Sequence, residues 1–263
     1  MSNEVTSKDY WNKYWSDEVK YPTYDISTGP FYSYHLIFSK YIELVRHRLG
    51  KNRLRVIDCG CGEGLILKYL AEQFENLEIW GIEYSDSYYK AKSMGEKLGF
   101  DLHLINGDIF SALDPELLES FDVVISVGLI EHFEDPSEIM NQMMRMLTKG
   151  GSIVTLIPNF NGLFNLLWKL YDSENYAYHV PIKKHELIQI HNNLGLVDVN
   201  FYTLGTPVLS GINSAIKPWQ KIIRFITSNV NGRILQRIIP KQSSLEKFYP
   251  STATVACAGF KRR

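Results

Sequence analysis

The chain has 263 residues, of which 45% are hydrophobic and 22% are charged. This composition predicts a folded globular protein with a sizeable core and excludes an intrinsically disordered chain. The formal net charge of −1 argues against general binding to the phosphate backbone of nucleic acids. No apolar run reaches the roughly 18–20 residues of a membrane-spanning helix, and the polar N-terminus does not resemble a signal peptide. The three cysteines, an odd number, lead us to expect a reducing, cytoplasmic location.

Residues 1–49 are predicted to form an aromatic N-terminal cap followed by a helix. Nine aromatic residues fall within residues 1–34, and those between Tyr10 and Trp15 have the spacing of a short helix with an aromatic face. Apolar residues at helical spacing then predict a helix over Ser33–Leu49, which Gly50 ends.

From residue 50 to residue 205, short apolar strands alternate with helices. The expected strands are Leu54–Asp58, Glu78–Glu83, Asp101–Ile105, Phe121–Val127, Ser152–Ile157 and Val197–Thr203, with a seventh at Thr252–Phe260. The expected helices are Leu65–Phe74, Asp86–Leu98, Ser137–Leu147, closed by a turn at Thr148–Gly151, and Lys184–Leu194. Near-continuous apolar strands that alternate with helices predict an α/β fold, in which helices cover both faces of a parallel sheet.

Two segments interrupt this alternation. Residues 159–178 follow the fifth strand and are rich in apolar side chains, which predicts a lid insert whose apolar face is either core or acceptor pocket. Residues 206–250 carry seven Lys or Arg against one Glu, a net charge of +6. Such a basic helical insert can contact a membrane surface, a partner subunit or an anionic substrate, or it can be an ordinary solvated helix pair. The predicted core is therefore 50–205, completed by a last strand within 251–263.

The loop after the first strand is the most informative stretch, and it reads DCGCGEG over Asp58–Gly64. In open α/β sheets, ligands bind at the carboxyl ends of the strands, where glycines let the backbone approach the ligand closely. The dinucleotide fingerprint G-x-G-x-x-G fails here, because Leu65 stands where the third glycine is required. Glu63 would also repel a pyrophosphate. The loop therefore suits a smaller ligand with little negative charge.

The next two strand ends offer acceptors for a nucleoside. Glu83 ends the second strand and can accept hydrogen bonds from both hydroxyls of a ribose. Asp108 follows the third strand and can accept from an exocyclic amine, while the neighbouring Ile109 can pack on a purine face. Together the three strand ends outline a site for a nucleoside with a small charged tail.

With these motifs in this order and spacing, the chain resembles the class I S-adenosylmethionine-dependent methyltransferases. The similar segments are VIDCGCGEG, WGIE, NGD, FDVVISVGLIEH and LTKGGSIVTLIPN. They are most like those of small-molecule enzymes such as ubiquinone-biosynthesis O-methyltransferases and sugar methyltransferases. The resemblance implies a doubly wound, Rossmann-like sheet of seven strands, mostly parallel with the last strand antiparallel, plus helical inserts. It also implies S-adenosyl-L-methionine as cofactor and S-adenosyl-L-homocysteine as product.

The resemblance also implies which residues contact the cofactor. Residues of the glycine loop and the end of the fourth strand would lie beside the methionine part, Glu83 would hold the ribose, and the Asp108–Ile109 pair would hold the adenine. In relatives the N-terminal segment folds over the cofactor, where a tyrosine can bond the methionine carboxylate; plain core packing is the alternative for that tyrosine. The expected cofactor-binding residues are Tyr14, Asp58, Gly60, Gly62, Glu83, Asp108, Ile109 and Val127.

Two histidines are candidates for the catalytic base. If the acceptor is a hydroxyl, a base has to take its proton, and neutral imidazole can do so, with a rate that rises with pH near the ordinary histidine pKa of about 6.5. His132 follows the fourth strand and is expected at the mouth of the cofactor site, unless it only braces the next helix. His179, after the lid insert, is its rival. His185 and His191 are interpreted as surface or cap residues.

The sequence leads us to expect methyl transfer, without a metal, to an oxygen of a small molecule. Metal-dependent O-methyltransferases place carboxylates at the ends of the fourth and fifth strands, where this chain has Ser126, Val127, Pro158 and Asn159. The acceptor that we expect first is a sugar- or nucleotide-linked precursor of a surface glycan. The alternative acceptor is a quinone-type or other hydroxylated metabolite. A cofactor-binding partner protein without catalysis is the alternative of another class. We expect a monomer or homodimer that does not bind nucleic acid.

Overall fold

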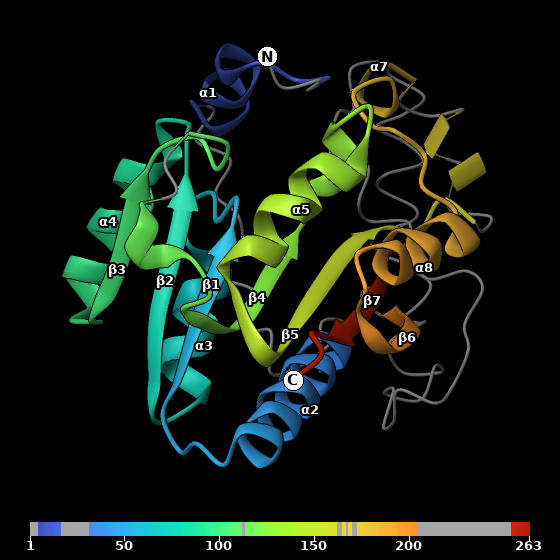
Figure 1. Cartoon of the computed structure of the whole chain (residues 1–263). Coiled ribbons are helices and arrows are strands. Elements are labelled where there is room, and N and C mark those ends of the chain that lie inside the picture. The colour runs from blue at the N-terminus through green and yellow to red at the C-terminus, as the bar shows by residue number, and fades with distance from the viewer. Residues whose placement is uncertain are drawn as a thin grey trace, which may run out of the picture.

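A seven-stranded sheet in the order β3-β2-β1-β4-β5-β7-β6 organises the computed structural model (Figure 1). The structure describes residues 5–16, 32–111, 114–161, 165–166, 168–169, 173–204 and 254–263. The strands are β1 (Leu54–Cys59), β2 (Leu77–Glu83), β3 (Leu102–Asn106), β4 (Phe121–Val127), β5 (Leu147–Pro158), β6 (Val197–Leu204) and β7 (Thr254–Phe260). β7 runs antiparallel to both β5 and β6, whereas the other pairs are parallel. The expected Rossmann-like sheet with an antiparallel last strand is confirmed.

Helices pack on both faces of the sheet. They are α1 (Lys8–Ser16), α2 (Tyr32–Leu49), α3 (Leu65–Gln73), α4 (Ser87–Leu98), α5 (Pro136–Met146), α7 (Ser173–Tyr176) and α8 (Lys184–Asn193). One hydrophobic cluster joins α5 and α8 to one face, and a second joins α2 and α3 to the other. Figure 1 shows α5 and α8 in front of the sheet and α1 beyond the end of β2. Among the described helices, none has the length and apolarity needed to cross a lipid bilayer.

The helix boundaries follow local capping chemistry. α5 begins where Asp135 accepts a hydrogen bond from the backbone N–H of Ser137, at 2.9 Å, with Pro136 in the first helical turn. Both features stabilise a helix N-terminus, because they use backbone groups that have no partner within the helix. α4 ends at Gly99 in the left-handed conformation, with φ of 71°, which glycine adopts without steric cost. The short aromatic helix expected near Tyr10–Trp15 is present as α1.

One predicted turn is wrong. Thr148–Gly151 was expected to separate a helix from a strand, but β5 runs through it from Leu147 to Pro158. Lys261, just after β7, binds this stretch on both sides: its carbonyl accepts from the N–H of Gly150, and its N–H donates to the carbonyl of Gly151. A Cβ on Gly151 would come within 2.6 Å of the Asp122 carbonyl oxygen. The second glycine therefore permits close approach to β4 rather than a turn.

Two predicted inserts lie wholly or partly outside the described residues. The basic segment 206–250 is entirely outside them, and so are residues 162–164, 167 and 170–172 of the predicted lid 159–178. The described part of the lid includes Phe160 and Trp168, which are buried in the cluster under α5 and α8.

The interpretation of His191 as a surface or cap residue is wrong. His191 is a residue of α8, and its side chain is fully buried. Its Nδ1 donates to the carbonyl of Leu187 at 2.8 Å. Desolvation lowers the pKa of His191 to about 4. His185, on the same helix, is exposed as expected, with 73% of its side-chain surface accessible. Helical spacing places these two side chains on different faces, and only packing against the sheet decides which face is covered.

We predict that His191 makes the protein less stable in acid. The unfolded chain binds a proton at this residue near pH 6.5 and the folded chain only near pH 4, so stability falls as the pH drops through that window. The full effect of one such group is about 3 kcal/mol at most. Urea unfolding of His191→Gln between pH 7 and 4 should therefore show a shallower loss of stability than the wild type. His185→Gln, on the same helix, should keep the wild-type slope; an equal change in both variants would contradict the assignment.

Candidate active site

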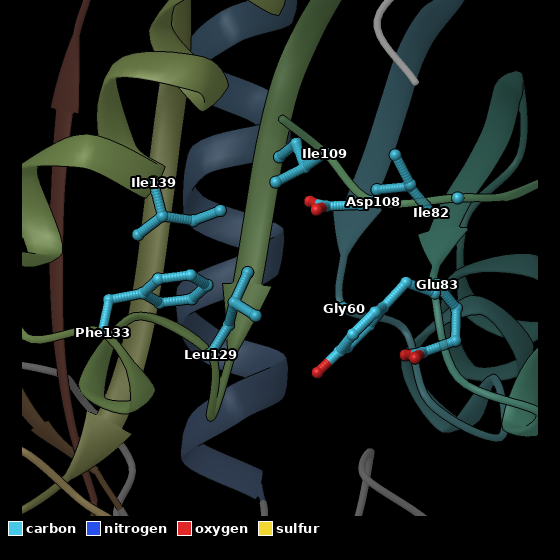
Figure 2. Close-up of a pocket in the computed structure, with 10 residues that line it drawn as sticks. Gly60, Ile82, Glu83, Asp108, Ile109, Leu129, Phe133 and Ile139 are labelled. Carbon is cyan, nitrogen blue, oxygen red and sulfur yellow. The ribbon is translucent and has the colours of Figure 1, made fainter. Parts of the chain in front are cut away.

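A pocket lies where the carboxyl ends of β1, β2, β3 and β4 meet. Gly60 follows β1, Glu83 ends β2, Asp108 follows β3 and Leu129 follows β4, and all four line it. Figure 2 shows Glu83 and Asp108 on one side of the space and Leu129, Phe133 and Ile139 on the other. The complete lining is Gly60, Ile82, Glu83, Tyr84, Gly107, Asp108, Ile109, Leu129, Phe133 and Ile139. Four of the residues expected to bind cofactor therefore share one pocket: Gly60, Glu83, Asp108 and Ile109.

Glu83 is buried and held in a fixed orientation. Its Oε2 accepts a hydrogen bond from the N–H of Gly62 at 2.9 Å, and its Oε1 accepts from the N–H of Ser85 at 2.8 Å. Each carboxylate oxygen has a further lone pair, so both can accept from a ligand's hydroxyl groups at the same time. Gly62, which was expected to bind the cofactor, does not line the pocket. Its backbone N–H positions the Glu83 carboxylate instead.

The far end of the pocket combines one carboxylate with an apolar slot. Asp108 accepts from the N–H of Phe110 at 2.9 Å through one oxygen, which orients the carboxylate beside the buried Ile109. Phe133 and Ile139 face Ile109 across the space (Figure 2). A planar ring can lie between apolar surfaces while a donor at its edge meets a carboxylate. This arrangement fits an aminated heterocycle.

Three other expected cofactor residues do not line the pocket. Asp58 is buried at the end of β1, its Oδ1 has no hydrogen-bond partner among the described residues, and burial together with the charge of Glu83 raises its pKa well above the ordinary value. Val127 ends β4 and pairs with Leu156 of β5. Tyr14 is 39% exposed on α1.

Sequence reasoning missed the apolar half of the lining. Tyr84 and Gly107 directly follow or precede predicted site residues, so their adjacency could have indicated them. Leu129, Phe133 and Ile139 come from the turn after β4 and from α5. Their apolar side chains look like core in the sequence, and only the packing of α5 against the sheet turns them toward a ligand space.

Helix α1 contacts the glycine loop and the start of α4. A Cβ on Gly62 would come within 2.8 Å of the Trp15 ring, so the indole lies against this loop. The side chain of Asn12 accepts from the N–H of Asp86 at 2.8 Å, and Lys90 donates to the backbone carbonyl of Trp15. The glycine at position 62 therefore leaves room for the indole as well as for the backbone turn.

The N-terminal segment, from Val5 into α1, also contacts the turn after β4 and the segment after α7. The backbone N–H of Val5 donates to the carbonyl of His132 at 2.8 Å, and the ring of Trp11 meets the His132 ring edge-on at 4.7 Å between centroids. The ring of Tyr10 lies 4.4 Å from that of Tyr178. The N-terminal segment therefore bridges two sides of the strand-end region.

The two candidate histidines are direct neighbours, with ring centroids 4.5 Å apart. Nδ1 of His132 lies 2.9 Å from the carbonyl of Tyr178, and Nδ1 of His179 lies 2.9 Å from the carbonyl of Asn175. Because a carbonyl only accepts, each Nδ1 carries the proton, and each Nε2 keeps a lone pair at neutral pH. Both residues can therefore accept a proton or bind a cation.

Burial makes both histidines weak bases. Desolvation and the neighbouring His179 lower the pKa of His132 to about 3, and desolvation lowers that of His179 to about 4. The imidazoles are therefore neutral throughout the physiological range. The rise in rate expected near the ordinary histidine pKa is accordingly no longer expected from either residue. The sequence could not predict this shift, because desolvation depends on how α1 and the segment after α7 cover the rings.

Comparisons with known proteins show that the chain is similar to methyltransferases. Residues 51–195 match the family described as "Methyltransferase domain". A ubiquinone biosynthesis O-methyltransferase of Pseudomonas fluorescens is 25% identical over 46% of this chain and 51% of its own length. An ajmaline N-methyltransferase of Rauvolfia serpentina is 27% identical over 40% of this chain and 36% of its own length. The match thus spans about half or less of these curated relatives.

Solved structures share the fold over nearly the whole chain. The plantazolicin methyltransferase BpumL in complex with SAH superimposes with a TM-score of 0.58 and 20% identity, covering 97% of this chain and 95% of that one. At this identity the likeness concerns the fold, and it agrees with the strand order described above.

We predict that Trp15 holds α1 in place. Trp15→Ala should remove the contact with Gly62 and speed tryptic cleavage after Lys13 within α1, because cleavage requires local opening of the helix. Limited proteolysis followed by mass spectrometry measures this rate. Tyr14→Ala, which removes the more exposed neighbouring ring, should accelerate cleavage less. A Trp15→Ala chain cleaved no faster than the wild type would show that the contact does not fix the helix.

Proposed function

The chain belongs to the methyltransferase domain family, and from this premise we propose that it transfers a methyl group from S-adenosylmethionine to an oxygen of a small molecule. The observation that carries the proposal is the pocket in which Glu83, Asp108 and Ile109 meet. Glu83 has free lone pairs for two ribose hydroxyls, and Asp108 stands beside an apolar slot that suits adenine. The glycine loop beside Gly60 would hold the methionine part.

The cofactor carries a sulfonium cation, and the surroundings of the loop favour such a charge. Asp58 is buried, and one of its oxygens has no partner among the described residues. Burial and the charge of nearby Glu83 raise the pKa of Asp58. A cationic ligand stabilises ionised carboxylates and offsets their desolvation. The same residues disfavour a pyrophosphate, so we expect no binding of a dinucleotide.

In the proposed reaction the acceptor oxygen attacks the methyl carbon in line with the carbon–sulfur bond. The new oxygen–carbon bond forms as the carbon–sulfur bond breaks, and the bonding electrons go to sulfur, which leaves as the neutral thioether of S-adenosylhomocysteine. The hydroxyl proton goes to the lone pair on Nε2 of His132, or of His179 beside it. Because both are weak bases, much of the acceleration comes from holding the reactants in line and excluding water.

Two acceptor classes are considered, and contacts among the described residues favour one of them. The rings of Phe160 and Trp168 lie 6.4 and 4.6 Å from that of His179, and Tyr176 packs edge-on against Trp168. Such an aromatic cluster favours a planar hydroxylated ring, as in a quinone-type metabolite. A sugar- or nucleotide-linked glycan precursor rests only on the resemblance of the inserts to those of sugar methyltransferases and on the basic segment 206–250, which lies outside the described residues. Incubation of the enzyme with labelled cofactor and both acceptor classes separates them. Cofactor binding without transfer to any acceptor would favour the non-catalytic alternative.

We predict that Glu83→Ala weakens binding of S-adenosylhomocysteine by roughly 1.5–3 kcal/mol, the range for losing hydrogen bonds to a charged group. Isothermal titration calorimetry of the wild type should show binding of this ligand and none of NAD. Glu78→Ala is the matched control, because Glu78 lies on the same strand but pairs with Arg55 away from the pocket. Tight NAD binding with no response to S-adenosylhomocysteine would refute the proposal.

We predict that His132→Ala lowers kcat by about 10²-fold, the lower end of the usual contribution of a general base because the pKa of this imidazole is low, with cofactor affinity nearly unchanged. His179→Ala tests whether the neighbouring imidazole has this role instead. His185→Ala, far more exposed, should keep the wild-type kcat. Full activity in both variants would mean that proximity and desolvation suffice, and that the acceptor is already nucleophilic.

A further inference from the structure

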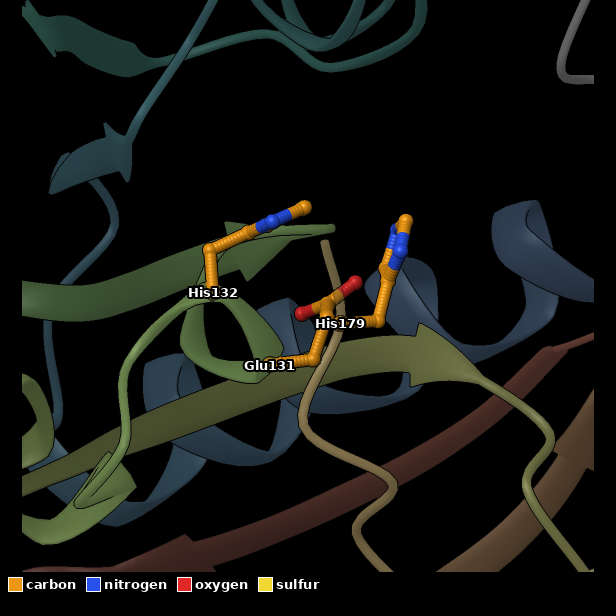
Figure 3. A group of neighbouring side chains, drawn as sticks. All are labelled: Glu131, His132 and His179. Atoms are coloured by element: carbon orange, nitrogen blue, oxygen red, sulfur yellow. The ribbon is translucent and has the colours of Figure 1, made fainter. Parts of the chain in front are cut away.

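We propose that Glu131, His132 and His179 bind one divalent transition-metal ion of the Zn²⁺ type beside the cofactor pocket. One ligand atom of each side chain lies within 4.8 Å of those of the other two. Figure 3 shows the three side chains pointing toward one another from the turn after β4 and the segment after α7. Two ligands at about 2.1 Å from a shared ion are about 3–4 Å apart, so small side-chain rotations would complete the site.

Glu131 is the observation that points to a bound cation. Its side chain is 1% exposed, and its Oε2 has no hydrogen-bond partner among the described residues. None of the ion pairs that the structure describes involves it. A buried carboxylate oxygen that has no partner among the described residues is costly, and a metal ion would supply the missing positive charge.

Backbone hydrogen bonds lock the three ligands into one unit. Nδ1 of His132 donates to the carbonyl of Tyr178, and the N–H of Val180 donates to the carbonyl of Glu131 at 2.6 Å. His179 is therefore fastened on both sides to the turn that carries the other two ligands. A second hydrogen bond, from Nδ1 of His179 to Asn175, fixes that ring as well. Imidazoles oriented in this way by backbone carbonyls are the usual arrangement around protein-bound metals.

The donor set selects the ion. Two neutral imidazole nitrogens and one carboxylate suit Zn²⁺, Fe²⁺ and similar ions, whereas Mg²⁺ and Ca²⁺ prefer oxygen ligands. Three protein ligands leave at least one coordination position open. The residues at the ends of the fourth and fifth strands, which lead us to expect no metal, do not bear on this site. Its ligands come from the turn after β4 and from residue 179, and only the folded chain brings them together.

The ion has a role in the proposed reaction, and this role, unlike the site itself, rests on the proposed function. Leu129 and Phe133, on either side of Glu131 and His132 in the chain, line the cofactor pocket. An acceptor hydroxyl at the open position would bind through oxygen, and the positive charge would lower the pKa of that hydroxyl. With the ion bound, Nε2 of His132 and of His179 would be ligands and could not act as the base proposed above, so the proton would leave to solvent before oxygen attacks the methyl carbon.

The site is tested by Zn²⁺ binding to metal-free full-length protein, measured in competition with a chromophoric chelator. We expect one Zn²⁺ per chain in the wild type and at least about tenfold weaker binding in Glu131→Gln and His179→Asn, the lower bound for disturbing a metal site. His185→Asn, an exposed histidine, is the control and should bind as the wild type does. Mg²⁺ should bind far more weakly than Zn²⁺. Thermal melting of each variant establishes that it is folded, and Glu131→Gln preserves the shape of the side chain.

Two results overturn the site: equal Zn²⁺ affinity in all four proteins, or no binding to the wild type at about 100 µM Zn²⁺. The proposed function fails separately, through calorimetry with S-adenosylhomocysteine on the metal-free protein. If that ligand binds and Zn²⁺ does not, the proposed function stands and the ion site falls. If Glu131→Gln loses Zn²⁺ binding but keeps the full rate of methyl transfer, the site remains and its role in the reaction falls.

Discussion

The pairing of β1 with β2 on one side and β4 on the other is the constraint on which the site depends. Parallel register aligns Asp58 with Gly81 and with Ile125, so the chain leaves neighbouring strands at the same edge of the sheet. Gly60 and Glu83 consequently meet although they are far apart in the sequence, and the Glu83 carboxylate binds the backbone of the glycine loop directly. A shift of β2 by a single residue would turn the Glu83 side chain to the other face of the sheet.

Most of the fold could be predicted from local pattern, because apolar runs and capping residues report secondary structure directly. Examples are the strand before DCGCGEG, the aromatic helix α1 and the start of α5, which is expected at Ser137 and lies at Pro136. The prediction failed where tertiary contacts override local preference. Two glycines after a helix usually signal a turn, yet Gly150 and Gly151 pair with the chain after β7 and let β5 pass close to β4. Burial of His191 was missed for the same reason.

The site residues likewise divide into those that local sequence predicts and those that depend on tertiary packing. Acceptors at strand ends, such as Glu83 and Asp108, are predictable because the sheet topology alone brings strand ends together. The apolar wall formed by Phe133 and Ile139 is not, since it depends on the angle at which the turn after β4 and α5 pack on the sheet. Nor does a sequence report desolvation, which removes most of the basicity of His132. Residue identity thus indicates which groups can act as acceptors or bases, and packing sets the pKa and the accessibility of each group.

His132 and His179 were treated as rivals in the sequence, but the geometry makes them parts of one unit. The carbonyl that holds the ring of His132 belongs to Tyr178, the residue before His179, and the backbone of Glu131 holds Val180, the residue after it. Loss of either imidazole therefore disturbs the position of the other. Residues that share a hydrogen-bond network in this way show non-additive effects when both are changed. The free energies lost in the two single variants should accordingly sum to more than the loss in the double variant, whichever atom receives the proton.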